Sequence, residues 1–125
     1  MSTSDELTRI AQQALQAAST VAEPVERVAA LAEARDRLDD AYNEALAEAV
    51  VSGYSFREVA QAARVAPNSV SPRLARSGLL ASYASDEGRV AANDVTLAQR
   101  DLQQSAPDTQ RLRFVPRKRS TRGRS

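Results

Sequence analysis

Apolar residues recur along the chain at the spacing of one helix face. The first stretch has them at i, i+3, i+4, i+7, i+8 and i+11: Leu7, Ile10, Ala11, Ala14, Leu15 and Ala18. This spacing predicts an amphipathic helix over about residues 4–19. Thr3 and Glu6 have the spacing of a capping box, which favours a helix start at this point.

A second, longer helix is predicted from Pro24 to about Ser52, because proline fits well at the first position of a helix. Seven-residue spacings place two lines of side chains on one side of it: Leu31, Leu38 and Ala45, with Val28, Arg35, Tyr42 and Ala49 beside them. Such a helix either packs within its own subunit or pairs with a second copy. Its length exceeds what one small domain covers, so we expect a homodimer through residues 24–52.

Three agreeing signals mark the next boundary. Gly53 is placed to end the long helix in a left-handed conformation. Ser55 and Glu58 have capping-box spacing, and Tyr54 and Val59 have the spacing of a hydrophobic staple around that box. We therefore expect a third helix over about residues 56–64.

Prolines shape the following segment. We expect one turn over Pro67–Val70 and then a helix from Ser71 to Ser77, with the two forming either separate elements or one kinked element. Gly78 would cap this helix. Ser85-Asp86-Glu87 would open a further helix whose apolar stripe is Ala91, Val95, Ala98 and Leu102, and Pro107 would close the folded region.

Composition narrows the chemistry. The chain has 125 residues, 42% of them hydrophobic, but alanine dominates this fraction and aromatics make up 4%. Such a core is thin, and a thin helical core often gains stability from a second subunit. There is no cysteine and no histidine, which removes disulfides, the common zinc ligands and the usual nucleophile–base pairs. We expect no enzyme, no cofactor and no bound metal.

The net charge of +1 conceals segregated charge. Residues 1–52 carry −6, residues 53–85 carry +3, residues 86–108 carry −3 and residues 109–125 carry +7. Two basic segments on an acidic scaffold favour a polyanion binder that presents only certain surfaces. The acids of the long helix are expected to form a solvated face rather than a metal site: Asp36, Asp39, Asp40 and Glu44.

The N-terminus "MSTSDELTRI" lacks the basic and apolar segments of a secretory signal. No apolar run reaches the length of about 18 residues that a membrane-spanning helix needs. A cytoplasmic protein without a membrane partner is the expectation.

The stretch "SFREVAQAARVAPNSVSPRL" resembles the helix-turn-helix of bacterial and phage DNA-binding proteins. The matching apolar positions are Val59 and Ala60 in the first helix, Val65 after the turn, and Val70 and Leu74 in the second. Arg64 stands at the turn position that is usually glycine, so a positive φ there carries a modest energetic penalty.

The resemblance implies an all-α DNA-binding domain over residues 1–107, with the helix-turn-helix at about 54–78 and the long helix before it. It places the second helix in the major groove, so Asn68, Ser69, Ser71 and Arg73 would meet base edges. Ser55, Arg57 and Arg64 would meet phosphates, and Arg76 belongs to the same basic segment.

A winged helix-turn-helix is the alternative fold. In that case Asp86-Glu87-Gly88-Arg89 would form the tip of a β-hairpin, although the residues before it alternate poorly between apolar and polar.

The last segment, residues 108–125, is expected to be a disordered basic tail, because it is highly charged and interrupted by proline and glycine. It would bind DNA phosphates through seven cations: Arg111, Arg113, Arg117, Lys118, Arg119, Arg122 and Arg124. Leu112, Phe114 and Val115 could instead dock on the domain or on a partner protein.

Taken together, these features predict a protein that binds double-stranded DNA at specific sequences. It would be a dimeric transcriptional regulator, or an accessory DNA-binding factor of a plasmid or phage. The alternative is a helical interaction protein that oligomerises through residues 24–52 and binds an acidic protein through its basic tail.

Overall fold

The computed structural model describes the backbone of residues 2–111 and the side chains of residues 2–104. This part of the chain is all-helical and contains no strand. Its elements are α1 (Thr3–Ser19), α2 (Pro24–Val51), α3 (Phe56–Ala63), α4 (Val70–Leu74) and α5 (Ala92–Arg111), with single 3-10 turns at Pro67–Ser69 and Ala81–Tyr83. The predicted all-α class is therefore confirmed for these residues.

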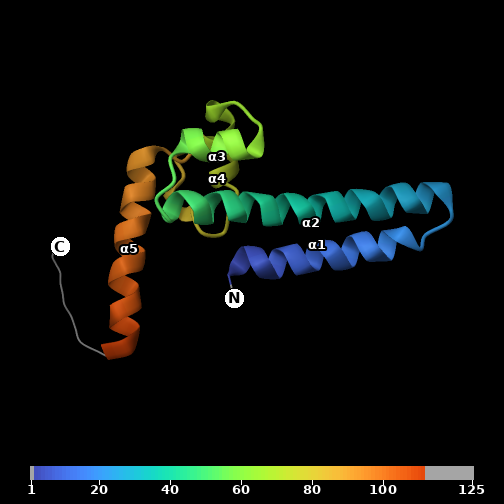
Figure 1. The fold of residues 1–125 in the computed structure, drawn as a ribbon, viewed down its shortest axis with the longest axis horizontal. Coiled ribbons are helices and arrows are strands. Elements are labelled where there is room, and N and C mark those ends of the chain that lie inside the picture. The colour runs from blue at the N-terminus through green and yellow to red at the C-terminus, as the bar shows by residue number, and fades with distance from the viewer. Residues whose placement is uncertain (1, 112–125) are drawn as a thin grey trace.

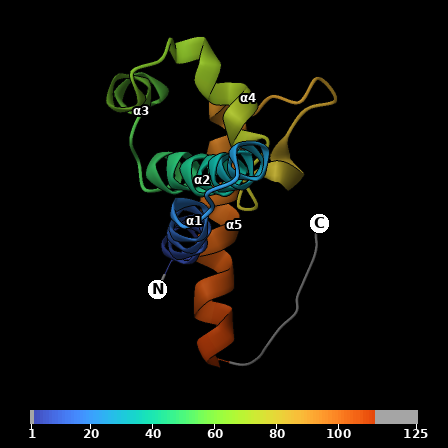
Figure 2. The same cartoon turned by 90° about the vertical axis from the view of Figure 1, so that its right-hand side faces the viewer.

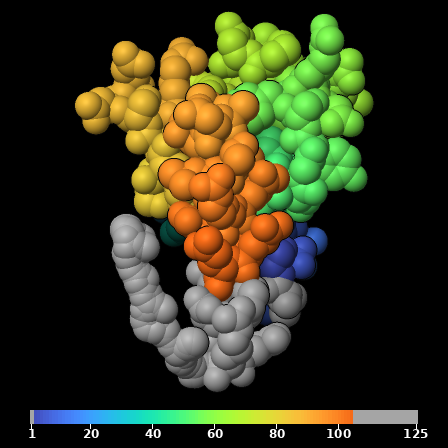
Figure 3. All heavy atoms as spheres, turned by 90° about the vertical axis from the view of Figure 1, so that its left-hand side faces the viewer, coloured from blue at the N-terminus to red at the C-terminus, as the bar shows by residue number. Residues whose placement is uncertain are grey.

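The helices form a protruding hairpin joined to a small helical body (Figure 1). α1 and α2 run antiparallel, and one end of this hairpin extends away from the other helices. α3 and α4 lie over the C-terminal half of α2, whereas α5 runs across the end of α2 (Figures 1 and 2). Figure 3 shows α5 seated between the segment that follows α4 and the segment that leads into α3.

Both predicted helices of the hairpin are present, but α1 begins with a different cap. Ser2 accepts a hydrogen bond from the Asp5 amide at 3.2 Å, and Asp5 accepts one from the Ser2 amide at 3.3 Å. The capping box thus uses Ser2 and Asp5 in place of Thr3 and Glu6, because Thr3 is already the first helical residue. Ser4 then donates from its amide and its hydroxyl to the Glu48 carboxylate, at 3.0 and 2.5 Å, which fastens the start of α1 to α2.

The junction between α2 and α3 follows the sequence closely. Gly53 adopts a φ of 116°, which favours glycine. Ser55 and Glu58 form the predicted capping box, with distances of 3.1 Å to the Glu58 amide and 2.8 Å to the Ser55 amide. Tyr54, expected to pack against Val59, instead exposes 58% of its surface while Val59 is buried.

α4 is shorter than predicted, since it ends at Leu74 and Gly78 does not take a left-handed conformation. Where a last helical turn was predicted, the buried Ser77 side chain forms hydrogen bonds to the backbone instead. Its hydroxyl donates to the Leu74 carbonyl at 2.7 Å and accepts from the Leu80 amide at 3.0 Å. The predicted end at Ser77 is therefore wrong, because a serine hydroxyl can compete with helical backbone bonding.

The segment from Ser85 to Arg89 is a tight turn rather than the predicted start of a helix. The Ser85 amide donates to the Arg89 carbonyl at 2.8 Å, and Gly88 has a φ of 77°, which a helix does not allow. α5 begins only at Ala92, where Asp94 accepts a hydrogen bond from the Ala91 amide at 2.9 Å. The turn of the winged alternative is present, but residues 2–111 supply no strands for a wing.

α5 is anchored at two places. Gln99 donates to the Val51 carbonyl at 2.9 Å, which satisfies an acceptor at the end of α2. Tyr83 donates to Asp101 at 2.6 Å. This hydrogen bond, followed by desolvation and the charge of Asp101, raises the pKa of Tyr83 above its ordinary value.

α5 also extends further than predicted. Its backbone remains helical through Pro107 to Arg111, so the expected end at Pro107 is wrong. A proline within a helix removes one backbone hydrogen bond and often bends the helix, but it does not always end it. Of the predicted stripe, Val95 and Ala98 are buried, whereas Ala91 and Leu102 are exposed.

The core lies where α2, α3, α4 and α5 meet. Its fully buried residues include Val50, Val70, Leu74, Leu80 and Val90. In the hairpin, by contrast, the buried apolar residues beyond this core are all alanines: Ala11, Ala18, Ala34 and Ala41. The hairpin thus buries small side chains between its helices, whereas several of its larger ones, including Leu15, Leu31 and Leu38, are exposed.

Among the described helices, none combines the length and the hydrophobicity that crossing a bilayer would require.

Candidate functional site

α3, the following turn and α4 form a closely packed helical pair on α2. Of the five apolar residues predicted to face inward, Val65 after the turn is half-buried, and the other four are buried: Val59 and Ala60 of α3, and Val70 and Leu74 of α4. Ala60 exposes only 1% of its surface. This arrangement confirms the predicted inward face, and it turns the opposite side of both helices toward solvent.

Arg64 ends α3 in the left-handed conformation, with φ of 63° and ψ of 41°. Its amide donates to the Ala60 and Gln61 carbonyls, and the Val65 amide donates to the Ala60 carbonyl at 3.0 Å. A left-handed residue with a side chain costs about 1 kcal/mol relative to glycine. The turn is therefore closed by backbone bonds around Arg64, while its guanidinium is exposed.

The solvent side of this pair carries cations from three places. Arg57 lies in the first turn of α3, Arg64 at its end, and Arg76 just after α4. All three are exposed, and none has a carboxylate within 4 Å among the side chains of residues 2–104. By comparison, Arg9 and Arg37 on the hairpin pair with Glu6 at 3.1 Å and with Glu33 at 2.8 Å.

Two further polar residues, Asn68 and Ser69, stand at the start of the second helix. Asn68 is exposed and Ser69 is half-buried at the 3-10 turn that leads into α4. Ser55 is also exposed, but its hydroxyl is occupied by the Glu58 amide as the cap of α3. Asn68, Ser69 and Arg76 therefore remain open to a ligand.

Arg73 lies against α2 and does not face outward as predicted. Its Nη1 donates to Oδ1 of Asn43 at 3.0 Å and lies 3.6 Å from Oδ1 of Asp39. Its guanidinium carbon lies 4.8 Å from the centroid of the Tyr42 ring, which adds a cation–π contact. Three side chains of α2 thus hold Arg73 against this helix.

Ser71 also differs from its prediction as a base contact. Its hydroxyl donates to the Val90 carbonyl, and its own carbonyl accepts from the Val90 amide at 3.3 Å. Ser71 therefore joins α4 to the segment before α5. A helical projection could have shown this, because Ser71 and Arg73 both lie nearer to Val70 and Leu74 than to the opposite side, where Pro72 and Arg76 lie.

Two features were missed at the sequence level. Glu44, assigned to a solvated acidic face, is 4% exposed and accepts a hydrogen bond from the Gly78 amide at 2.8 Å. Arg89, weighed only as part of a wing tip, is exposed on the turn after α4 together with Asp86 and Glu87. No local signal places Glu44 inside, because its partner lies 34 residues away along the chain.

The predicted tail cations Arg113, Arg117, Lys118, Arg119, Arg122 and Arg124 lie outside the described residues. Arg111 is the last residue of α5. In the part of the chain that the structure describes, no cluster of three or more acidic side chains has the arrangement of a metal site.

Comparison with known proteins adds no family assignment, since no protein-family model, no curated protein and no solved structure matches this chain. The arguments for its function therefore rest on its own residues and geometry.

Proposed function

We propose that this protein binds double-stranded DNA through the outward side of α3, the turn and α4, as a helix-turn-helix unit. Its role would be that of a transcriptional regulator or of a plasmid or phage accessory factor. The observation that carries the proposal is the set of three exposed arginines without acidic partners among the described side chains, on a helical pair whose inward apolar residues are buried or half-buried.

Exposed cations on this pair suit phosphate binding for a physical reason. An arginine already paired with a carboxylate must give up that partner before it contacts DNA, whereas Arg57, Arg64 and Arg76 have no such cost. Arg57 and Arg64 would contact the backbone, which fixes the position of the unit on the duplex. The Ser55 hydroxyl oxygen accepts from the Glu58 amide as the cap of α3, but its O–H can still donate to a phosphate.

Base contacts are assigned to the residues that remain outward on and near α4. Asn68 can make a bidentate contact with adenine, and Arg76 with guanine. Ser69 adds a hydroxyl beside them. Arg73 is given a different role: it holds α4 on α2 and thereby sets the angle at which these residues approach the groove.

The acidic hairpin supports this orientation. Residues 1–52 carry a net charge of −6, which disfavours DNA contact at the hairpin, whereas residues 53–85, which contain α3 and α4, carry +3. Phosphate binding by the tail cations remains a prediction. If four of them contact phosphates, a plot of the logarithm of the association constant against the logarithm of the salt concentration should be steeper by a slope of about −4.

The test is a fluorescence anisotropy titration with a duplex selected from a random pool and with a scrambled duplex of equal length. Asn68→Ala and Arg76→Ala should each weaken binding to the selected duplex about 5- to 150-fold, because each base contact supplies about 1–3 kcal/mol of discrimination. Binding to the scrambled duplex should change much less. Replacing the seven tail cations by glutamine should weaken both duplexes alike and flatten the salt dependence.

Arg27→Ala is the matched control, since Arg27 is also an exposed arginine but lies on the hairpin. It should leave both affinities unchanged. If the chain shows no binding to either duplex at low salt, or if Arg27→Ala acts as strongly as Arg76→Ala, the proposal is wrong.

A second candidate function has support from a different observation. The hairpin exposes large apolar side chains, which is common at protein–protein interfaces. A helical interaction protein would use this surface and bind an acidic partner through its tail. Absence of DNA binding at low salt would favour this candidate.

A further inference from the structure

One side of α2, between α1 and α3, carries a continuous apolar stripe. It is formed by the two lines of residues at seven-residue spacing, and we call it the α2 stripe: Val28, Leu31, Arg35, Leu38, Tyr42, Ala45 and Ala49. Figure 2, viewed along α2, shows α1 and α3 on either side of this free face. Part of the stripe is thus already flanked by the chain's own helices.

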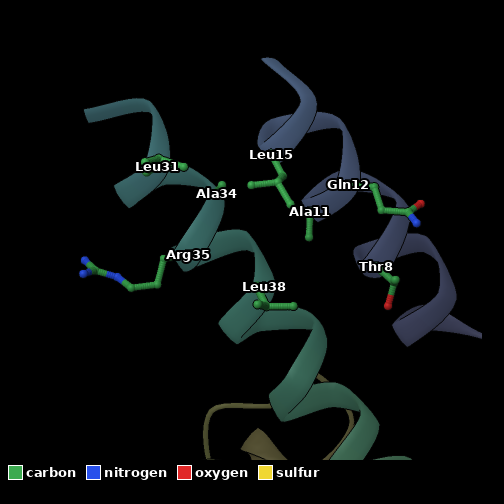
Figure 4. Close-up of a pocket in the computed structure, with 8 residues that line it drawn as sticks. All are labelled: Thr8, Ala11, Gln12, Leu15, Leu31, Ala34, Arg35 and Leu38. Atoms are coloured by element: carbon green, nitrogen blue, oxygen red, sulfur yellow. The ribbon is translucent and has the colours of Figure 1, made fainter. Parts of the chain in front are cut away.

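The stripe has two halves. Near the body, Tyr42, Ala45 and Ala49 form an apolar groove with Val59, Ala62 and Ala63 of α3. Farther out, Leu31, Ala34 and Leu38 form a groove with Ala11 and Leu15 of α1, shown in Figure 4. In that outer groove the leucines remain 56% exposed at Leu15, 43% at Leu31 and 59% at Leu38. The open part of the stripe is therefore centred between Leu31 and Leu38.

This half of the hairpin is packed in the reverse of the usual order. Alanines lie between the two helices, and the leucines, which would gain most from burial, lie outside. Arg35 is the charged residue of the stripe, and Figure 4 shows its side chain extending away from α1. The Arg35 side chain is 74% exposed, and its Nε lies 3.9 Å from Oδ1 of Asp36. The guanidinium can therefore stay in water at the edge of the stripe while the aliphatic part of the side chain covers apolar surface.

We propose that a second copy of this chain covers the α2 stripe, with the two α2 helices antiparallel and a two-fold axis between Leu31 and Leu38. An antiparallel pairing with this axis sets Leu31 of each copy against Leu38 of the other. The same patch then serves both copies, as a two-fold interface requires.

The exposed area agrees with a dimer. A half-exposed leucine or valine leaves on the order of 80–100 Å² of apolar surface. The four large side chains at Leu15, Val28, Leu31 and Leu38 therefore provide roughly 350 Å² per copy, or about 700 Å² from two copies. Specific interfaces bury about 1,200–2,000 Å² in total, of which somewhat more than half is apolar.

The same geometry has a consequence for DNA, which rests on the function proposed above. The stripe lies roughly a quarter to a third of a turn around α2 from the side that holds Asn43, Ala47 and Val50 under α3 and α4. A two-fold axis perpendicular to the paired α2 helices therefore returns both α3–α4 units to the same face of the dimer. α1 lies on the other side of the stripe in each copy.

The spacing of these units follows from helix geometry. Leu46 and Ala47, below α3 and α4, lie about 12 residues from the axis, which is about 18 Å at 1.5 Å per residue. The two units would then lie about 35 Å apart along α2. This distance matches one turn of B-DNA, over which dimeric helix-turn-helix proteins contact successive half-sites.

Sedimentation velocity of the full chain without DNA tests the dimer directly. We expect a dimer at micromolar concentration, a loss of at least ten-fold in association for Leu38→Glu, and tighter association for Arg35→Leu. Leu97→Glu is the matched control, because Leu97 is 46% exposed on α5, away from the stripe. Circular dichroism confirms that each variant remains helical.

Cysteine cross-linking tests the direction of pairing, and the chain has no native cysteine to interfere. Mixing Leu31→Cys with Leu38→Cys should yield a disulfide between the two variants, whereas each variant alone should yield little. In the proposed arrangement equal positions lie about 10 Å apart, beyond disulfide reach. Cross-linking within each variant and not between them would indicate a parallel pairing and overturn the proposal.

A monomeric full chain also overturns it. If Leu38→Glu in such a monomer speeds tryptic cleavage at the tail arginines, the stripe is instead covered by the chain's own basic segment.

These measurements contain no DNA, so a negative result in them is distinguishable from a failure of the DNA-binding proposal. With DNA, selected half-sites should be centred 10–10.5 base pairs apart. If the chain forms the dimer but binds no DNA, the proposed interface stands and only the proposed function is wrong.

Discussion

Arg73 and Asn43 join α4 to the middle of the scaffold through a hydrogen bond of 3.0 Å between Nη1 and Oδ1. Asn43 is 5% exposed, so its side-chain oxygen depends on this donor. Asp39 and Tyr42 complete the contact around the guanidinium. This arginine therefore helps to hold α4 on α2, even though its residue type alone suggests a DNA contact.

Removing this arginine should lower the free energy of unfolding. Arg73→Ala leaves the buried Asn43 oxygen without its donor, which costs about 1–3 kcal/mol. Arg73→Lys should recover only part of this loss, because lysine lacks the planar fork that reaches Asn43 and stacks on Tyr42. Urea denaturation measures both variants. Unchanged stability in Arg73→Ala would show that the contact does not hold α4.

Replacing Arg64 by glycine should, in contrast, raise the free energy of unfolding. Arg64→Gly should raise the stability by about 1 kcal/mol, because glycine takes the left-handed conformation without strain. Arg64→Val should lower it, since a β-branched residue is poorly suited to positive φ. Urea denaturation again provides the measurement. A loss of stability in Arg64→Gly would indicate that the arginine side chain stabilises the turn by more than its strain costs.

Ala60 allows a test of the close approach between α3 and its neighbours. Ala60→Leu should destabilise the fold by about 1–3 kcal/mol or more, because Ala60 exposes 1% of its surface and leaves no room for added carbon. Gln61→Leu is the control, since Gln61 is exposed on the same helix. Thermal denaturation followed by circular dichroism should show a lower Tm for Ala60→Leu alone.

Tyr83 should make the stability depend on pH in the alkaline range. Its pKa is raised in the folded protein, so its hydrogen bond to Asp101 contributes fully below the unfolded value of about 10. This contribution is lost as the pH rises through the raised pKa, because the phenolate repels the carboxylate. Urea denaturation from pH 8 to 11 should show a steeper decline for the native chain than for Tyr83→Phe. Parallel declines would contradict this assignment.

Local sequence signals predicted the helix boundaries that local contacts determine. The cap at Ser55 and Glu58 and the glycine at Gly53 each depend on residues within a few positions of one another, so the sequence shows them directly. The start of α5 was misplaced because acids near Ser85 resemble a helix start, whereas Gly88 closes a turn there.

The candidate site was predicted less completely, because its orientation depends on distant partners. Arg73 and Ser71 were assigned by residue type to the outward side, but Asn43 and Val90 bind them from 30 and 19 residues away along the chain. Asn68 and Arg76 kept their predicted exposure because no such partner reaches them within the described residues.

The alanine layer between α1 and α2 also sets an order of opening for the molecule. Small side chains contribute little hydrophobic free energy on burial, so α1 gains less from packing on α2 than the core helices gain from one another, and its hydrogen bonds from Ser4 to Glu48 add to this weaker hold. Amide protons of α1 should therefore exchange with deuterated solvent well before those of the helices around Val50 and Leu74. Warming would release the first helix while the remaining ones still hold their tertiary contacts.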